Sequence, residues 1–393
     1  RLAQQGVVLV TINYRLGPWG FLAHPALSAE SSHDSSGNYG LMDKIAALNW
    51  VRDNISAFGG DADNVTIFGQ SAGSSSICAL MASPLSEGLF HKAIGQSAAC
   101  LYPPGADPDG QKRGQALAQA ALKITGISTK KPVTAETLRK IDNQSLLQAA
   151  AASDWAAESR IVVDGWVLPE PAGDIFRAGR QARVPVLLGS TANEGHMLFP
   201  LNEDLSRSDL DAYLTQTFGS LSAEVISAYA KEIRVSPGFA QREISTDLFM
   251  AYGMRDWASH MRRTNVATYL YFMDYVPPAF QIYLANEPNL DLPEGPRSAG
   301  AYHSGDLVYV FNNLDRFAIE WTEEDRAMAH TMSGYWTQFA QTGNPNRADL
   351  PNWPSYTIDQ HHTLRLGSSI ATVLGARRQK LNLMQRRFTK NTR

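Results

Sequence analysis

The chain has 393 residues, of which 44% are hydrophobic and 19% are charged, a balance that argues against intrinsic disorder. The formal charge of −3 leaves no basic surplus for nucleic-acid binding, and no apolar run approaches the roughly 18 residues of a membrane span. The only cysteines, Cys78 and Cys100, exclude a disulfide scaffold and a four-cysteine metal site but permit one bridge.

The pattern of apolar residues predicts strands that alternate with helices along the chain. A β-branched run over residues 6–15 predicts a strand buried on both faces, and residues 41–55 have helical spacing. Further strands are expected at residues 64–68, 93–97, 184–189, 267–275 and, at a sheet edge, 363–366. Further helices are expected at residues 72–82, 110–152, 221–233, 239–263, 323–342 and 369–387. This order predicts an α/β fold with a doubly wound, mostly parallel sheet flanked by helices.

The motif Gly-x-Ser-x-Gly occurs at residues 69–73, between a predicted strand and a predicted helix. This context is typical of a nucleophile elbow, in which a strained turn lifts the serine hydroxyl above the sheet. We expect Ser71 to be the nucleophile, Gly69 and Gly73 to avoid Cβ clashes, and the Ala72 N–H to face a developing oxyanion. Alternatively, Ser71 is only a helix N-cap. A similar stretch at residues 95–99 lacks the second glycine and is interpreted as structural.

A serine nucleophile needs a base, and a carboxylate to hold that base. Among nine histidines, His303 follows a long loop and has small residues on both sides, so its imidazole could reach into a site. The carboxylate should follow an intermediate strand, a place that Glu194 and Asp274 both occupy. Asp306 is expected to be a helix N-terminal acid.

The chain resembles the type-B carboxylesterase family, which includes the cholinesterases, nearly from end to end. The segments that carry the resemblance are residues 13–17 (NYRLG), 37–43 (GNYGLMD), 58–61 (FGGD), 64–73 (NVTIFGQSAG), 162–165 (VVDG), 193–195 (NEG), the surroundings of His303, and 336–346 (WTQFAQTGNPN). The resemblance implies an α/β-hydrolase fold, one domain over residues 1–393, and helical insertions above the site. It also implies Ser71 as nucleophile, Glu194 rather than Asp274 as the acid, and His303 as the base.

The sequence departs from the family in two ways. Gln70 stands where the family often has Glu, which removes a negative charge beside Ser71 and disfavours choline esters. The family's glycine-rich oxyanion loop and the strand before it lie upstream of the residue that matches Gly6, and this sequence has no such segment. We therefore expect a chain truncated at its N-terminus and missing the first strands, with weak activity because Ala72 lacks its partner donors.

The expected function is hydrolysis of uncharged, small to medium carboxylic esters through an acyl-enzyme, with the ester as the partner and no nucleic acid. Two alternatives remain: a non-catalytic scaffold of the same fold, or amide or carbamate hydrolysis by the same residues. The sequence contains no H-E-x-x-H motif and no glycine loop for a dinucleotide or nucleoside triphosphate, so we expect neither a metal nor a cofactor.

Overall fold

One six-stranded sheet forms the centre of the molecule. The computed structural model describes all residues except 102–108, 128–131, 154, 156–160, 279–296, 318–319 and 391–393. The strands lie in chain order as β1 (Thr66–Gln70), β2 (Lys92–Gln96), β3 (Val186–Thr191), β4 (Thr268–Met273), β5 (His362–Leu366) and β6 (Ile370–Leu374). The first five are parallel and β6 is antiparallel to β5, which confirms a mostly parallel sheet.

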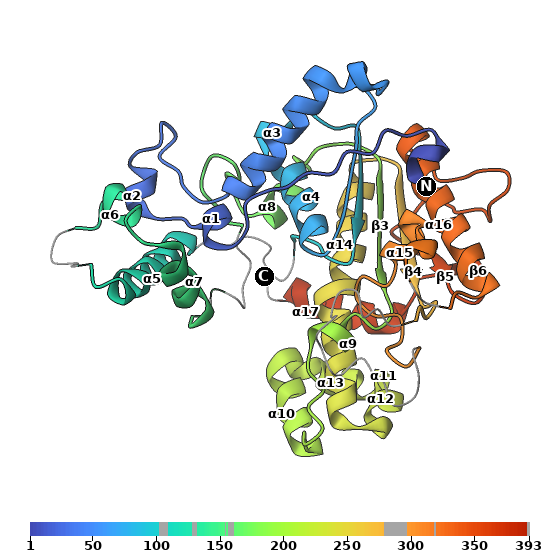
Figure 1. Cartoon of the computed structure of the whole chain (residues 1–393). Helices are drawn as coiled ribbons and strands as arrows, with labels where there is room; N and C mark the ends of the chain where they lie inside the picture. Colours follow the sequence, from blue (N-terminus) through green and yellow to red (C-terminus); the bar gives the residue numbers. More distant parts are fainter. Residues whose placement is uncertain are drawn as a thin grey trace.

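Helices cover both faces of this sheet (Figure 1). One face carries α3 (Tyr39–Asn54), α4 (Ala72–Ala82), α8 (Ala172–Arg177) and α14 (Tyr252–Arg263); the other carries α15 (Leu307–Phe311) and α16 (Glu323–Thr342). Neighbouring strand residues alternate between the two apolar clusters, since Leu188 packs with α4 and α14 whereas Leu187 packs with α16. A strand buried on both faces explains the unbroken apolar run of β3.

Two helical lobes project from the sheet (Figure 1). The first contains α1 (Gly17–Phe21), α2 (Pro25–Ser28), α5 (Gly110–Ile124), α6 (Ala135–Leu138) and α7 (Asn143–Ala151). The second contains α9 (Gly195–Leu198), α10 (Arg207–Phe218), α11 (Ser222–Ala228), α12 (Ala230–Val235), α13 (Pro237–Thr246) and the π-helix η6 (Asp247–Ala251) that leads into α14. The C-terminal helix α17 (Arg378–Lys390) packs on the second lobe, where Met384 joins an apolar cluster with Leu214 and Ile244.

Cys78 and Cys100 form a disulfide that links α4 to the segment after β2, with Cα atoms 5.6 Å apart. Both cysteines are buried in the core on the α4 face of the sheet. The bridge closes a separation of 22 residues and so anchors the helix that follows Ser71 to the neighbouring strand. A loop of this length corresponds to about 3 kcal/mol of stabilisation in the chain-entropy account.

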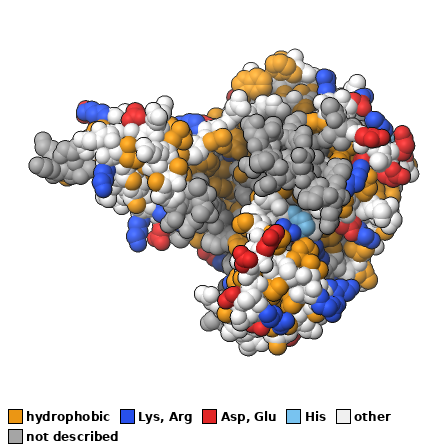
Figure 2. Space-filling view, turned by 60° about the horizontal axis from the view of Figure 1, so that its bottom comes forward, with side chains coloured by type: hydrophobic (Ala, Val, Ile, Leu, Met, Phe, Trp, Pro, Cys, Tyr) orange, Lys and Arg blue, Asp and Glu red, His pale blue; other side chains and the backbone are white. Residues whose placement is uncertain are grey.

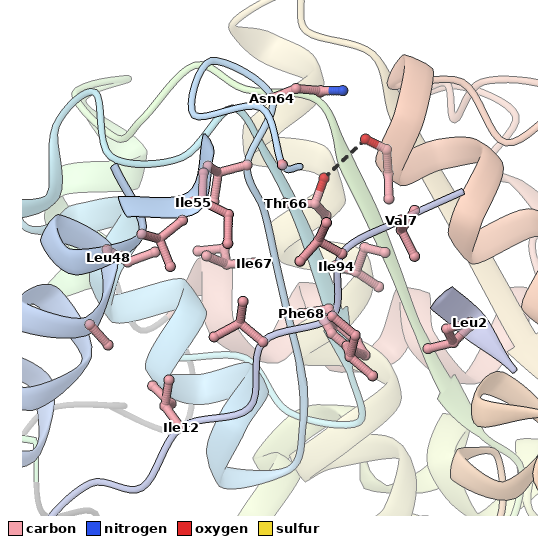
Figure 3. A pocket seen from close by; sticks show the side chains of 18 of the residues that line it. Leu2, Val7, Ile12, Leu48, Ile55, Asn64, Thr66, Ile67, Phe68 and Ile94 are labelled. Atoms are coloured by element: carbon pink, nitrogen blue, oxygen red, sulfur yellow. Dashed lines mark hydrogen bonds between the residues drawn. The ribbon is translucent and has the colours of Figure 1, made fainter. Parts of the chain in front are cut away.

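The predicted strand over residues 6–15 is wrong, because these residues pair with no strand in the described part of the chain. Val8, Leu9, Val10 and Ile12 are each 37–45% exposed. The segment instead borders a cavity of about 710 Å³ that is also lined by β1, α3, α4 and α16 (Figure 3). A β-branched run favours an extended backbone, but a strand also needs a neighbouring backbone to pair with.

The C-terminal prediction is also corrected. Residues 369–387 do not form one helix, because residues 370–374 form β6 and α17 begins only at Arg378. Gly375 and Arg377, both with positive φ, make the turn between them. Strand β5 is consequently an inner strand and not the expected edge.

No helix in the described ranges is both long enough and apolar enough to cross a membrane.

Candidate active site

Ser71 occupies the sharp turn between β1 and α4, with φ 56° and ψ −121°. Its backbone N–H donates to the Gln96 carbonyl at 2.8 Å and so continues the ladder between β1 and β2. A Cβ on Gly69 would lie 2.8–3.2 Å from backbone atoms of Gly73, so only glycine fits there. A Cβ on Gly73 would meet nothing within 4 Å among the described residues, so the clash expected for that glycine is absent.

Ala72 is the first residue of α4, so its N–H has no carbonyl one turn back in the helix to bond with. The residue is exposed beside Ser71, at the positive end of the helix dipole. This backbone donor is suited to an anion that forms on a group attacked by Ser71.

Glu194 and His303 are brought together although 109 residues separate them, with His303 Nδ1 and Glu194 Oε2 2.6 Å apart. Both side chains are buried. Glu194 has no exposed surface, so it is not simply a loop carboxylate exposed to solvent. The Thr191 N–H donates to Glu194 Oε1 at 2.7 Å, which fixes the carboxylate. The loops themselves are joined because the Asn193 N–H donates to the Ala301 carbonyl at 2.9 Å.

The other ring nitrogen of His303 contacts Gln70, with the two Nε2 atoms 3.1 Å apart. Because the Gln70 amide nitrogen can only donate, His303 Nε2 accepts and Nδ1 carries the proton toward Glu194. This is the tautomer that a general base requires. The Ser71 hydroxyl makes no hydrogen bond to His303 within the described residues. Sequence reasoning missed this role of Gln70, although its place directly before Ser71 was the available signal.

The competing acids have other partners. Asp274 Oδ2 accepts from Arg365 Nε at 2.7 Å, which makes it part of an ion pair at the end of β4. Asp306 stands at the N-cap position of α15, but its side chain makes no capping hydrogen bond; it is fully buried and accepts from Gln96 Nε2 and Tyr271 OH, both at 2.8 Å. Burial raises the pKa of Asp306 above its ordinary value. Neither carboxylate hydrogen-bonds to His303.

The stretch at residues 95–99 also places a serine at positive φ, with Ser97 at 57°. Ser97 is completely buried, and its N–H donates to the Gly189 carbonyl at 2.8 Å. A side chain with no exposed surface cannot meet a substrate, which agrees with the structural interpretation of this motif.

No cluster of three or more histidine, cysteine or acidic side chains that could hold a metal occurs in the part of the chain that the structure describes.

On the face shown in Figure 2, acidic and basic side chains are interspersed with apolar ones over the lobe of α9–α13.

The chain is similar to known esterases. The chain is 36% identical over 385 residues to para-nitrobenzyl esterase of Bacillus subtilis (strain 168), which covers 94% of this chain and 71% of that protein. It is 33% identical over 363 residues to fumonisin B1 esterase of Sphingopyxis macrogoltabida, which covers 90% of this chain and 63% of that protein.

Solved structures of esterases have the same fold. A carboxylesterase of Geobacillus stearothermophilus matches with a TM-score of 0.80 at 30% identity, covering 98% of this chain and 77% of that one. A thermophilic PNB esterase matches with a TM-score of 0.77 at 34% identity, covering 98% of this chain and 75% of that one. The fold is therefore that of the α/β-hydrolases. Residues 1–388 match the Carboxylesterase family, and the chain belongs to this family of carboxylic ester hydrolases.

Proposed function

We propose that the chain hydrolyses carboxylic esters with Ser71 as nucleophile, His303 as general base and Glu194 as the acid that holds the base. The observation that carries the proposal is the 2.6 Å contact between the buried side chains of Glu194 and His303. It orients the imidazole so that Nε2 holds its lone pair on the side of Gln70 and Ser71. A buried carboxylate that is hydrogen-bonded to one imidazole nitrogen leaves the other nitrogen free to act as a general base.

The reaction begins when His303 Nε2 exchanges the Gln70 amide for the Ser71 hydroxyl, which follows Gln70 directly in the chain. Ser71 Oγ attacks the acyl carbon while His303 takes its proton, and Glu194 stabilises the imidazolium that forms. The Ala72 N–H has no acceptor within the helix and donates to the oxyanion. His303 then protonates the leaving alcohol, and water hydrolyses the acyl-enzyme by the same steps.

The substrates we propose are uncharged esters of small to medium size. Gln70 brings no negative charge to the site that could hold a cationic alcohol group. Apolar side chains lie shortly after Glu194: Met197 and Leu198 are 37% and 38% exposed, and the ring of Phe199 lies 5.6 Å from that of Phe249 in η6. The relative named para-nitrobenzyl esterase is, by its name, an enzyme for an uncharged aromatic ester, and the same substrate class suits these side chains.

The proposal is tested with a fluorophosphonate and with a neutral para-nitrophenyl ester. We expect one adduct, on the peptide that contains Ser71, and ester turnover that Ser71→Ala abolishes. Ser97→Ala is the matched control, because Ser97 is a second positive-φ serine after a strand but is buried. Equal background turnover by the wild type and Ser71→Ala would leave the non-catalytic scaffold as the function. Turnover of the matching anilide at a comparable rate would favour amide hydrolysis.

Replacing Gln70 by Glu is expected to move the pH dependence of the reaction. A carboxylate 3.1 Å from Nε2 stabilises the protonated imidazole, and a protonated His303 cannot accept the Ser71 proton. The rise of kcat/KM with pH should therefore shift upward by about 1 pH unit, with lower kcat/KM at neutral pH. The measurement is a pH–rate profile with an uncharged ester. Gln70→Ala removes the hydrogen bond to Nε2 but adds no charge, so its midpoint should rise by less than that of Gln70→Glu. An unmoved midpoint in Gln70→Glu would contradict the contact.

A further inference from the structure

A second histidine, His196, lies two residues after Glu194 in the short helix α9. Its Nδ1 is 2.9 Å from the carbonyl oxygen of Ala299, and its Nε2 is 3.1 Å from Oε1 of Glu243 on α13. The side chain is 14% exposed, and Phe239 packs against the ring edge-on with the centroids 6.0 Å apart. The ring therefore bridges three separate segments of the chain.

Both partners of the His196 ring are oxygen atoms that accept hydrogen bonds. A neutral imidazole has one N–H and would direct its other nitrogen's lone pair at an oxygen, whereas an imidazolium donates to both. Glu243 is available as an anion. Although burial alone raises the pKa of its carboxyl, the hydrogen bond from His196 and the charge of Arg377 bring that pKa below its ordinary value.

Two arginines lie near the ring, and neither one pairs with Oε1 of Glu243 in the described part of the chain. Arg377, which precedes α17, is shared between Asp247 of η6 (2.7 Å) and Oε2 of Glu243 (3.2 Å). Arg242 of α13 lies over the ring of Phe239, 5.6 Å from its centroid, and forms no ion pair with Glu243 in the described part of the chain. Oε1 of Glu243 is thus left to His196 and to a longer contact with the Asn193 amide.

The two ring contacts join the loops that carry the proposed acid and base. His196 belongs to the loop of Glu194, and Ala299 lies four residues before His303. Asn193 already links these loops, since its Oδ1 accepts from the Ala301 N–H at 3.1 Å. His196 adds a second tie on the other side of Glu194 and fastens both loops to α13.

We propose that His196 is a positioning residue, held as an imidazolium that ties the Glu194 loop to the His303 loop and to α13. The inference rests on the proposed function, because it assigns His196 to the geometry of that same acid–base pair. It acts through Glu194 and His303 and touches no reacting atom. A shift of about 1 Å in such a pair lowers turnover by up to about 10²-fold.

The protonation of the ring is tested directly in the whole 393-residue chain labelled with ¹⁵N at histidine. Long-range ¹H–¹⁵N correlation spectra at about pH 7 should show both His196 nitrogens at the position of protonated nitrogen. The His196→Gln variant assigns the signal. One nitrogen at the non-protonated position would overturn the imidazolium. This measurement needs no turnover, so it gives the same answer if the Ser71→Ala experiment disproves ester hydrolysis.

The positioning role is tested by kinetics. His196→Phe keeps a ring against Phe239 but has no donor, and we expect kcat to fall roughly tenfold while KM changes by less than about twofold. His196→Gln retains a donor and should recover part of the loss. His260→Gln is the matched control, since His260 is a buried histidine 3.7 Å from a carboxylate, Asp256, near the C-terminal end of α14. Wild-type kcat in a folded His196→Phe, or a change in KM alone, would overturn the role.

Discussion

Replacing Glu194 by Gln is expected to lower kcat by about 10⁴-fold. The carboxylate accepts two hydrogen bonds, from the Thr191 N–H on Oε1 and from His303 Nδ1 on Oε2. A glutamine amide has one oxygen, so its NH₂ group must face one of these donors. His303 then turns or changes tautomer, and Nε2 loses the lone pair that would accept the Ser71 proton.

The measurement is kcat for a neutral ester together with the unfolding midpoint, so that lost activity is not mistaken for lost structure. Asp274→Asn is the matched control, because Asp274 also follows a strand of the sheet but pairs with Arg365. We expect Asp274→Asn to keep kcat within about threefold of the wild type, as is usual for a group outside the reacting pair. A larger effect of Asp274→Asn than of Glu194→Gln would mean that Asp274, and not Glu194, is the acid.

Replacing Gly69 by Ala should lower the free energy of unfolding by about 3 kcal/mol, the upper end of the usual cost of overpacking. The new Cβ would lie 2.8 Å from the carbonyl carbon and 3.0 Å from the Cα of Gly73. These are backbone atoms of α4, so no side-chain rotation can relieve the contact. Relief requires α4 to move away from β1, which also displaces Ser71 and should abolish most turnover.

Gly73→Ala is the companion experiment for this prediction. A Cβ there meets nothing within 4 Å in the described structure, and alanine is favoured over glycine in a helix. Chemical denaturation of both variants should show Gly73→Ala as stable as the wild type or up to about 1 kcal/mol more stable. If alanine were tolerated equally well at both positions, the close approach of β1 and α4 would not explain why residue 69 is glycine.

The sequence was most informative where structure depends on neighbours in the chain. The helix predicted at residues 72–82 has those bounds, and the strand before it is shifted by two residues, to 66–70. A strand, a glycine turn and a helix of small residues are local signals, and the strain at Ser71 follows from them. The helix predicted at 239–263 is interrupted by a π-helix at 247–251, a detail that apolar periodicity does not encode.

Contacts between residues far apart in the chain were harder to predict from the sequence. Spacing alone left Glu194 and Asp274 as alternatives, and the preference for Glu194 came from the family resemblance. The contact between Gln70 and His303 spans 233 residues and has no sequence signal beyond adjacency to Ser71. The run at residues 6–15 was predicted as a strand for the same reason, because its residue types favour extended backbone while pairing depends on what lies beside it.

Asn193 and Tyr302 form a parallel bridge just beyond the end of β3, so the sheet's backbone pairing extends into the loops of Glu194 and His303. The helices α10–α13, in contrast, pack with η6 and α17 around a separate apolar cluster. The proposed acid and base therefore lie on loops held by the sheet and by α13, whereas α10–α12 form no hydrogen bond with either residue in the described structure. We expect substitutions and insertions in α10–α12 to alter the preference among esters while leaving the proposed acid–base pair in place.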